Sequence, residues 1–310
     1  MRTAVLVNPH ARALQQKPKL ITAVTLAAGG SARVWVTRDA VAVTRAAEEI
    51  ASTGAERVVL CGGDGTLMSA VTALHRAAAT SSAGMPELVI APAGTVATVA
   101  RNFGQRAGLL DTVRRAVAFE PPRRRLRTPT LELQVEEGTL LGFIFGTGLV
   151  ARFFEKYYAQ GAGGYRRAAL ITLRTFVGSF VEDAYSSSVL DPLPCEVTID
   201  GATLEPRAFS LVVASVVKDL GLHMWVTPRA AEDPTRPHVV CKSLTVKRLG
   251  PQAHRVLRGL PIEGPGFDGL CERLAVTFPD AAGPLVLDGD VLFSRTAIVR
   301  AGPVVRVAAY

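Results

Sequence analysis

The chain has 310 residues, of which 48% are apolar, and a formal net charge of +8 that comes mostly from arginine. This length and apolar content suffice for one large or two ordinary buried cores. No apolar stretch is long enough to span a bilayer, and the start, MRTAVLVNPH, is typical of a strand and turn rather than of a signal peptide. The cysteines have no CxxC spacing, which excludes a disulfide framework or zinc site and indicates reduced thiols in a cytoplasmic protein: Cys61, Cys195, Cys241 and Cys271.

Short apolar segments alternate with helical segments along the first third of the chain. The pattern predicts strands, each ending in a turn, within residues 3–9, 32–37, 57–66 and 86–95, and helices over 40–53 and 67–79. Such alternation is typical of a parallel sheet covered by helices on both faces, in which ligands bind beyond the carboxyl ends of the strands. The turn motifs NPH, VTRD, GGDGT and PAGT all follow predicted strands, so we expect them to converge on one crevice.

A basic segment, Arg114 to Pro129, follows this α/β pattern. It is consistent with a solvated arginine-rich face joined to a proline-stiffened linker, or with a surface attracted to anionic lipid. Nucleic acid is not expected as a partner, because no aromatic interleaving and no recognition motif accompanies the charge. The segment alone does not decide between the first two interpretations.

Beyond this segment the pattern changes to a period of two. Alternating apolar residues with Gly and Asp turns predict a mainly antiparallel second domain, with strands within residues 128–148, 195–204, 208–217 and 274–292. One helical stretch, residues 165–185, interrupts these strands. Its apolar stripe is expected to pack in the core rather than to face a membrane: Leu170, Leu173, Val177 and Phe180.

The segment GGDGT has the composition of a phosphate-binding turn. Gly62, Gly63 and Gly65 let the backbone approach a ligand closely and expose amide N–H groups. Thr66 is expected to begin a helix whose N-terminus favours an anion, although a structural turn in which Asp64 caps the helix is the alternative. No GK[ST] follows, so this is not a Walker loop. Mg²⁺ binds carboxylate and phosphate oxygens together and is therefore the simplest ligand that reconciles Asp64 with an anion.

Three further glycine-containing segments follow apolar stretches. In PAGT, Gly94 and Thr95 lead into a helix and are expected to form a second wall of the same nucleotide crevice. The segment GTGLVA, residues 146–151, fits a dinucleotide fingerprint, but the acidic residue about 20 positions later is missing, so the match is interpreted as accidental. In LDGD, Asp288 and Asp290 flank a glycine, which in isolation favours a hairpin turn.

With GGDGT, PAGT and LDGD in this order, the sequence resembles the diacylglycerol-kinase catalytic-domain superfamily over essentially the whole chain. The nearest likeness is to bacterial soluble lipid kinases, with sphingosine and ceramide kinases as relatives and NAD kinases as distant ones. The resemblance implies an α/β nucleotide-binding domain, residues 1–125 with a C-terminal return at about 292–310, and a β-sandwich lipid-substrate domain, residues 126–291. It also implies an active site in the cleft between these domains.

The resemblance further implies roles for individual residues. It places ATP against the GGDGT turn, with nucleotide contacts from Asn8, Thr37, Gly62, Gly63, Asp64, Gly65, Thr66, Gly94 and Thr95. Asp288 is the implied general base, which activates the lipid hydroxyl for in-line attack on the γ-phosphate. Asp64 is the second catalytic carboxylate and acts through Mg²⁺ or its bound water. A segment that holds a second Mg²⁺ in some members matches Glu232-Asp233-Pro234, which makes Asp233 a further metal candidate.

Several positions depart from the pattern of the family. Ala97 stands where the motif GT-x-N has asparagine, and Val150 replaces the acidic residue of GxGfDa. Pro234 interrupts the DDG segment, Asp290 replaces the glutamate of DGE, and the turn NPxSG is NPHAR. These departures fit either a divergent lipid specificity or lost activity. The two candidate catalytic carboxylates are intact, which argues for retained chemistry.

The leading functional hypothesis is an ATP- and Mg²⁺-dependent kinase that phosphorylates the primary hydroxyl of a neutral lipid, of the diacylglycerol or the ceramide and sphingoid type. Because no membrane span is predicted, such an enzyme is expected to be cytoplasmic and to dock peripherally on anionic lipid at the inner membrane face. The alternatives are phosphorylation of a soluble metabolite such as NAD, and a non-catalytic lipid- or nucleotide-binding module. The sequence leaves open which lipid is the acceptor and whether the chain forms a homodimer.

Overall fold

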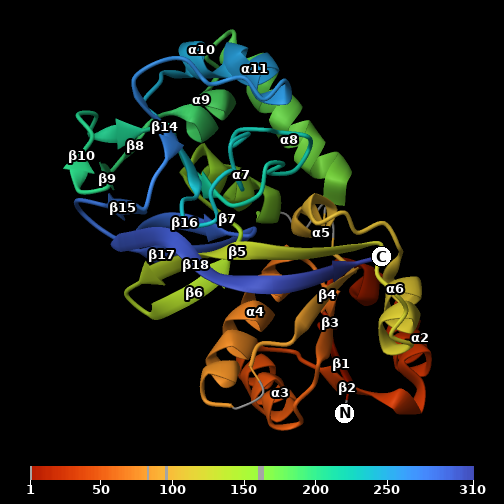
Figure 1. Cartoon of the computed structure of the whole chain (residues 1–310). Coiled ribbons are helices and arrows are strands. Elements are labelled where there is room, and N and C mark those ends of the chain that lie inside the picture. The colour runs from red at the N-terminus through yellow and green to blue at the C-terminus, as the bar shows by residue number, and fades with distance from the viewer. Residues whose placement is uncertain (1, 82–83, 95–96, 160–163) are drawn as a thin grey trace. The chain divides into compact units, whose positions relative to one another are not determined.

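A computed structural model describes residues 2–81, 84–94, 97–159 and 164–310 of the chain. The chain forms two compact units, unit 1 (Met1–Thr128 with Val304–Tyr310) and unit 2 (Pro129–Pro303), so it leaves unit 1 once and returns to it at the C-terminus (Figure 1). The family resemblance places this return at about residue 292. In the structure, residues 290–300 still pair with strands of unit 2, and unit 1 takes up the chain from Val304.

The sheet of unit 1 is parallel, as predicted, with the strand order β4-β3-β1-β2. The end of β18 joins it beside β4, also in the parallel direction, with Val307 opposite Leu88. Every residue of β1 and β3 is buried, which explains why these strands appear in the sequence as short apolar runs without alternation. The strands are β1 (Thr3–Val7), β2 (Ala32–Val36), β3 (Arg57–Gly62), β4 (Glu87–Pro92) and β18 (Thr296–Ala309).

Helices cover both faces of this sheet (Figure 1). Alternate strand residues such as Val5, Val59 and Val89 form a buried cluster with α2 and α6 on one face. Helices α3 and α4 pack against each other over the opposite face. The helices of unit 1 are α1 (Arg12–Gln16), α2 (Lys19–Ala28), the 3₁₀ helix η1 (Gly29–Ser31), α3 (Ala40–Ser52), α4 (Asp64–Ala79), α5 (Thr98–Asn102) and α6 (Leu109–Val117).

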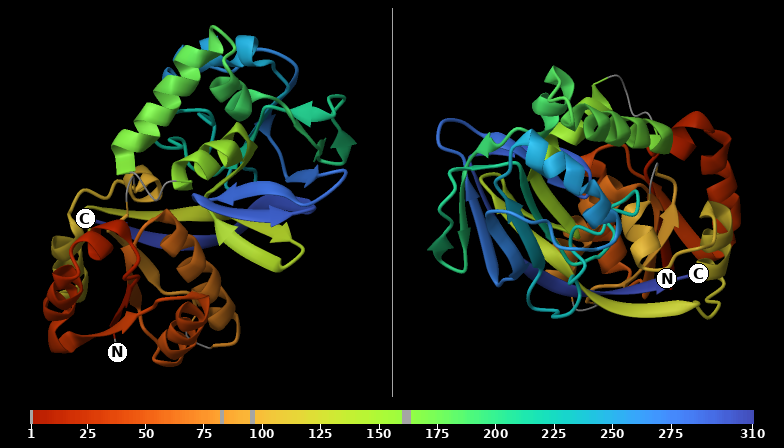
Figure 2. Two further views of the ribbon diagram at one scale, coloured as in Figure 1. Left: turned by 180° about the vertical axis from the view of Figure 1, so that it is seen from behind. Right: turned by 90° about the horizontal axis from the view of Figure 1, so that it is seen from above.

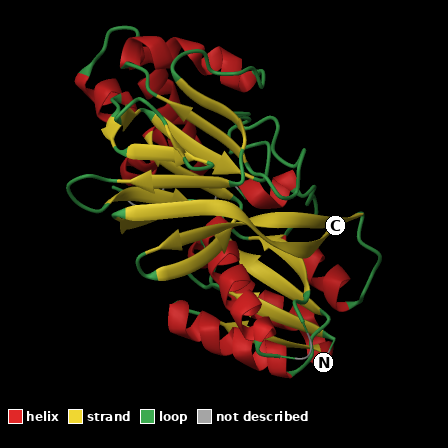
Figure 3. Ribbon diagram, turned by 60° about the vertical axis from the view of Figure 1, so that its left-hand side comes forward, coloured by secondary structure: helices red, strands yellow, loops and turns green. Residues whose placement is uncertain are grey.

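Unit 2 is rich in antiparallel strands, as predicted (Figure 3). One sheet has the order β14-β13-β12-β7-β16-β17, and further strands pair as β10-β9-β15-β18, β5-β6 and β11-β8. These strands are β5 (Arg124–Val135), β6 (Gly138–Gly142), β7 (Ile144–Gly148), β8 (Leu193–Pro194), β9 (Glu196–Ile199), β10 (Ala202–Thr203), β11 (Ala208–Phe209), β12 (Leu211–Ser215), β13 (His238–Lys242), β14 (Gly266–Leu270), β15 (Arg273–Thr277), β16 (Gly283–Leu287) and β17 (Asp290–Ser294).

The helices of unit 2 pack in a layer on the sheet that contains β12 and β13. A buried apolar cluster joins α9 and α10 to these strands through residues that include Val189, Val213 and Val240. Helix α8 packs on α7, where Ala168 of α8 contributes to a buried cluster with Tyr157 of α7. Helix α8 ends at Ser179 and α9 begins at Ala184, so the single helix predicted over 165–185 is divided between two helices in the structure. The helices are α7 (Leu149–Tyr158), α8 (Gly164–Ser179), α9 (Ala184–Leu190), α10 (Val246–Leu249), the 3₁₀ helix η2 (Gly250–Gln252) and α11 (Ala253–Leu257).

The prediction that the apolar stripe of α8 packs in the core is wrong. Leu170, Leu173, Val177 and Phe180 are 64%, 60%, 57% and 55% exposed. The opposite side of the helix is buried instead, and Ile171 is the one large apolar side chain among the small residues that make up most of it. The buried side consists of Ala168, Ile171, Thr175, Gly178 and Ser179.

The basic segment Arg114–Pro129 runs from the end of α6 into β5, with an irregular connection that contains Pro121 and Pro122 between them. Only this short part is a proline-containing linker, since the first and last residues of the segment belong to the helix and the strand. The Arg115 guanidinium lies 3.2 Å from the Glu120 carboxylate, and that of Arg125 lies 2.9 Å from the Glu87 carboxylate. Ion pairs therefore neutralise part of the charge that the sequence places on this segment.

Candidate active site

The turns that follow β1 and β3 meet at the carboxyl edge of the unit 1 sheet, as predicted. Asn8, directly after β1, donates a hydrogen bond from Nδ2 to Oγ1 of Thr66 at 2.8 Å. Its Oδ1 accepts the amide of His10 at 2.9 Å, which fixes the orientation of the side chain. Asn8 thereby connects the NPH turn to the GGDGT turn.

Glycines bring GGDGT and PAGT into direct contact. A Cβ atom on Gly94 would lie 2.5 Å from Cα of Gly63, which is backbone. A Cβ atom on Gly62 would lie 2.4 Å from the side chain of Thr66. The glycines are therefore required by the packing of one turn against the other, and the junction presents backbone rather than side chains.

Substituting Gly94 by alanine is expected to destabilise unit 1, because neither the new Cβ nor the Gly63 backbone has room to move. The expected loss in the free energy of unfolding is about 1–3 kcal/mol, as for an overpacked site. Gly30→Ala is the matched control: a Cβ there meets nothing within 4 Å, and a change within about 0.5 kcal/mol is expected. Denaturant unfolding measures both variants, and equal midpoints would contradict the contact.

Helix α4 begins at Asp64, three residues before the predicted start at Leu67. The Leu67 amide makes the first bond of the helix, to the carbonyl of Gly63 at 3.0 Å. The amides of Asp64, Gly65 and Thr66 precede this bond and have no acceptor within the helix. Together with the helix dipole they make the start of α4 suitable for an anion such as a phosphate group.

The Asp64 carboxylate caps a neighbouring helix rather than its own. Its Oδ2 accepts the amide of Thr98 at 2.9 Å, and its Oδ1 accepts the amide of Val99 at 3.3 Å, at the start of α5. Burial raises the pKa of the Asp64 carboxyl, while these hydrogen bonds and the nearby charge of Arg101 offset part of the rise. Asp64 therefore holds PAGT and its helix against GGDGT.

The described side chains around Asp64 fit Mg²⁺ only if the phosphates of a nucleotide supply further ligands. Among the described residues, no group of three or more His, Cys, Asp or Glu side chains is arranged to hold a metal by itself. Mg²⁺ is commonly held by one or two carboxylates, several waters and substrate phosphates. A carboxylate has about four acceptor positions, more than capping uses, so Asp64 retains capacity for the ion or for its bound water.

Ala97, the position of the family's asparagine, adopts a left-handed backbone conformation with φ 52° and ψ 47°. This conformation costs a residue other than glycine roughly 1 kcal/mol, and asparagine tolerates it better than alanine. Ala97→Asn is therefore expected to raise the free energy of unfolding by about 0.5–1 kcal/mol. Ala118→Asn, at a helical φ of −70°, is the control for which no gain is expected. Thermal unfolding tests both, and a gain at Ala118 alone would contradict this explanation.

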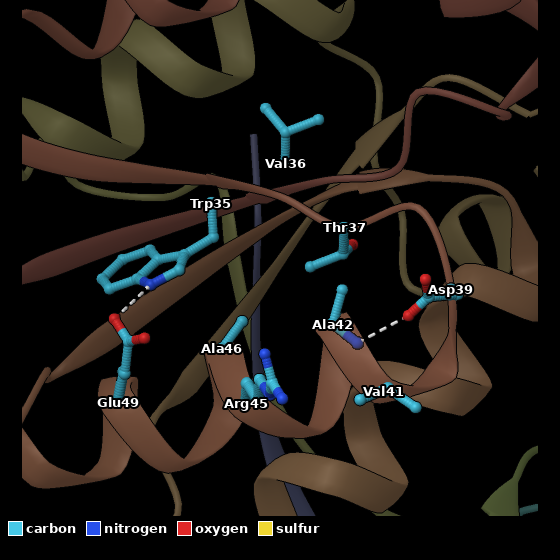
Figure 4. Close-up of a pocket in the computed structure, with 9 residues that line it drawn as sticks. All are labelled: Trp35, Val36, Thr37, Asp39, Val41, Ala42, Arg45, Ala46 and Glu49. Carbon is cyan, nitrogen blue, oxygen red and sulfur yellow. Dashed lines mark hydrogen bonds between the residues drawn. The ribbon is translucent and has the colours of Figure 1, made fainter.

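Of the remaining nucleotide candidates, Thr95 lies outside the residues that the structure describes. Thr37, after β2, is buried, and its amide and hydroxyl both donate to the carbonyl of Val7, at 2.9 and 3.4 Å. It borders a pocket of about 300 Å³ between the end of β2 and α3 (Figure 4). The other lining residues include Trp35, Asp39, Arg45 and Glu49. The nucleotide contacts of Thr37 and Thr95 stay predictions.

In unit 2, Asp288 and Gly289 form the two-residue hairpin turn between β16 and β17. Their φ angles are 49° and 92°, as in a type I′ turn. Asp288 is 4% exposed, and its carboxylate accepts the amides of Phe143 at 3.0 Å and Ile144 at 2.8 Å. Aspartate before glycine is a favoured choice in such a turn, so the feature that sets this position apart is the burial of its carboxylate.

Aromatic residues of α7 surround this turn and were not identified from the sequence. The Tyr158 hydroxyl donates to the carbonyl of Gly289 at 3.0 Å, and the Phe154 ring lies against the same glycine. On the other side, a Cβ atom on Gly142 would lie 2.8 Å from the Asp288 carboxylate. The aromatic run FFEKYY, one residue after GTGLVA, is the sequence signal for this contact.

Asp233, the second metal candidate, lies in an exposed turn of unit 2. Its Oδ1 accepts the amide and the hydroxyl of Thr235, at 2.8 and 2.7 Å, and these bonds lower the pKa of the carboxyl. Within the described ranges, Asp233 belongs to no cluster that would hold a metal by itself. Its metal role stays a prediction.

Comparisons with known proteins concern the family and the fold. Residues 2–120 match the family model of the diacylglycerol kinase catalytic domain, whereas no curated protein matches the chain. A solved structure from Bacillus anthracis str. Sterne, provisionally named a diacylglycerol kinase, is 17% identical with a TM-score of 0.68, covering 100% of this chain and 96% of its own. A further structure from that organism, a diacylglycerol kinase, is 14% identical with a TM-score of 0.62, covering 100% and 97%. The likeness confirms the fold class: an α/β unit followed by a strand-rich antiparallel unit.

Proposed function

Because residues 2–120 match the family model of the diacylglycerol kinase catalytic domain, we propose that this chain is a lipid kinase of that superfamily and transfers the γ-phosphate of ATP to the primary hydroxyl of a neutral lipid. The acceptor class that we propose is diacylglycerol or a ceramide-type or sphingoid lipid. The products are a lipid phosphate monoester and ADP.

The observation that carries this proposal is the junction of turns at the start of α4. The Asn8 side chain is bonded to the Thr66 side chain, and the backbone of Gly63 packs on Gly94, so the NPH and PAGT turns both contact the turn that begins α4. A helix N-terminus with unpaired amides suits phosphate, and the glycines allow a ligand to approach the backbone. This arrangement supports binding of a nucleotide through its phosphates.

In the proposed mechanism, the turn from Gly62 to Thr66 orients the phosphates of ATP through backbone amides, and Asp64 holds Mg²⁺ or its bound water. Mg²⁺, when bound, neutralises charge that develops on the phosphoryl oxygens. Asp288 accepts the proton of the lipid hydroxyl as its oxygen bonds to the γ-phosphorus. The bond from that phosphorus to the oxygen of the ADP leaving group breaks in the same in-line step. Positioning supplies most of the acceleration in such reactions.

A lipid acceptor also requires access to a bilayer. Across the described ranges, no helix is both long enough and apolar enough to cross one. We therefore propose that the protein works from the cytoplasm as a peripheral protein at the inner membrane face, attracted by anionic lipid.

A panel assay tests the proposal. Purified protein, radiolabelled ATP and Mg²⁺ are incubated with diacylglycerol, ceramide, a sphingoid base or a monoacylglycerol in detergent micelles, and with NAD in solution. Label is expected in at least one lipid and not in NAD. Label in NAD alone would favour the soluble-metabolite alternative, and ATP binding without any transfer would favour a non-catalytic module.

A further inference from the structure

Helix α8 and the residues directly after it present a continuous apolar stripe to solvent. Leu170, Leu173 and Val177 lie at helical spacing on one side, and Phe180 and Val181 extend the stripe past the end of the helix. Their exposed fractions run from 55% for Phe180 to 75% for Val181. Apolar side chains exposed contiguously, rather than singly, mark an interaction surface.

The stripe is not the side through which α8 packs on the rest of unit 2, because a different side of the helix is buried. Ala168 and Ile171 pack against α7, and Ser179 lies so close to η2 that a Cβ on Gly250 would be 1.8 Å from its hydroxyl. The stripe points away from both contacts. In the two views of Figure 2, α8 lies at the surface of unit 2.

The charges around the stripe indicate what it binds. Between Lys156 and Val181 the sequence contains four basic residues and no acidic residue: Lys156, Arg166, Arg167 and Arg174. Arg166 and Arg174 are exposed, and each is four residues from Leu170 along the helix, so their guanidinium groups border the stripe. The Arg174 guanidinium also lies 3.9 Å from the centroid of the Tyr185 ring, which holds it beside α8.

An apolar helix face bordered by arginine is the pattern of a helix that lies in the interface of an anionic bilayer, with its apolar side chains among the acyl chains and its arginines at the headgroups. A second copy of the chain fits less well. In a two-fold symmetric pair each stripe would face its own copy, which brings the arginines of the two copies together. Like charges in close contact oppose such a dimer.

We propose that the stripe of Leu170, Leu173, Val177, Phe180 and Val181, with Arg166 and Arg174, docks the protein on an anionic bilayer. The proposal deepens the proposed lipid kinase function, since it names the surface through which unit 2 reaches a membrane-embedded acceptor. It does not need ATP, Mg²⁺ or turnover, so it is tested separately from catalysis.

Co-sedimentation with sucrose-loaded vesicles tests the surface. Wild type is expected to bind phosphatidylcholine vesicles that contain phosphatidylglycerol, and to bind vesicles of phosphatidylcholine alone more weakly. Replacing Leu170, Leu173 and Val177 by glutamine, which keeps the helix, is expected to weaken binding at least about tenfold. Arg166→Gln with Arg174→Gln is expected to abolish the preference for the anionic vesicles.

The matched control replaces two equally exposed apolar residues of unit 1, Leu26→Gln with Val41→Gln, which are 76% and 63% exposed. This control is expected to bind vesicles like wild type. Absent binding by wild type, or equal binding by the stripe variant and wild type, would overturn the proposal. The proposal would also be overturned if the stripe variant changed the oligomeric state in gel filtration but bound vesicles as well as wild type. Activity on micelle-dispersed lipid reports on the kinase proposal independently.

Discussion

Replacing Asp288 by asparagine is expected to lower kcat for lipid phosphorylation by about 10²–10⁴-fold, the range that general base catalysis contributes. Asparagine has nearly the same shape but does not take up the proton of the acceptor hydroxyl. Since the nucleotide turns belong to unit 1 and Asp288 to unit 2, the affinity for ATP is expected to stay within a few-fold of wild type.

The local structure makes this substitution informative. In wild type, Oδ1 of Asp288 accepts the amides of Phe143 and Ile144 at 3.0 and 2.8 Å, and Oδ2 lies 3.1 Å from the Phe143 amide. The amide oxygen of asparagine retains the first two bonds, so a stability loss of only about 1 kcal/mol is expected. Asp290→Asn, on the exposed side of the turn, is the matched control. Unchanged kcat in Asp288→Asn with the expected small stability loss would assign Asp288 a purely structural role.

Two substitutions of Asp64 separate capping from metal chemistry. The amide oxygen of asparagine can retain one of the two bonds to the Thr98 and Val99 amides, whereas alanine retains neither, so Asp64→Ala is expected to lose about 1 kcal/mol of stability relative to Asp64→Asn. If the charge of Asp64 acts through Mg²⁺, both variants are expected to lose activity by about 10²-fold or more. Steady-state kinetics over a range of Mg²⁺ concentrations measures this loss. Activity retained by asparagine and lost only by alanine would mean that Asp64 is a cap and no more.

The raised pKa of Asp64 also gives a pH dependence with a definite sign. A carboxyl whose pKa is higher in the folded state binds its proton more tightly there, so it favours folding at low pH and this contribution is lost as the pH rises. The loss begins near the ordinary aspartate pKa of about 3.9 and continues through the raised value. Without nucleotide, the stability of Asp64→Asn relative to wild type is therefore expected to increase as the pH rises from the ordinary aspartate pKa through the raised value. Denaturant midpoints across this range test it, and a decrease would contradict the direction of the shift.

Much of unit 1 is predictable from its sequence because buried parallel strands leave a strong signal. The apolar runs before GGDGT and PAGT correspond to β3 and β4, and the turns after β1, β3 and β4 meet as expected. The strand-rich character of unit 2 follows equally from its alternating pattern. The contact between Gly63 and Gly94 explains why so many glycines are needed at this one point.

Other features depend on tertiary contacts that no local pattern encodes. The partner of Asp64 is the start of α5, more than thirty residues away, so its cap is not visible in the sequence around it. The stripe of α8 is misassigned because periodicity identifies an apolar side but not whether something covers it. In α8, Ile171 and the small residues around it are buried, whereas the apolar residues of the stripe are exposed.

The most direct measurement of the central claim is a product analysis by mass spectrometry. Purified protein is incubated with ATP, Mg²⁺ and micelle-dispersed diacylglycerol or ceramide, and lipid phosphate and ADP are quantified together. Phosphoryl transfer predicts one lipid phosphate monoester for each ADP formed, and about 10²–10⁴-fold slower formation of both in Asp288→Asn. ADP formation without a phosphorylated lipid, or phosphorylated lipid at the same rate in Asp288→Asn, would contradict the proposed lipid kinase mechanism.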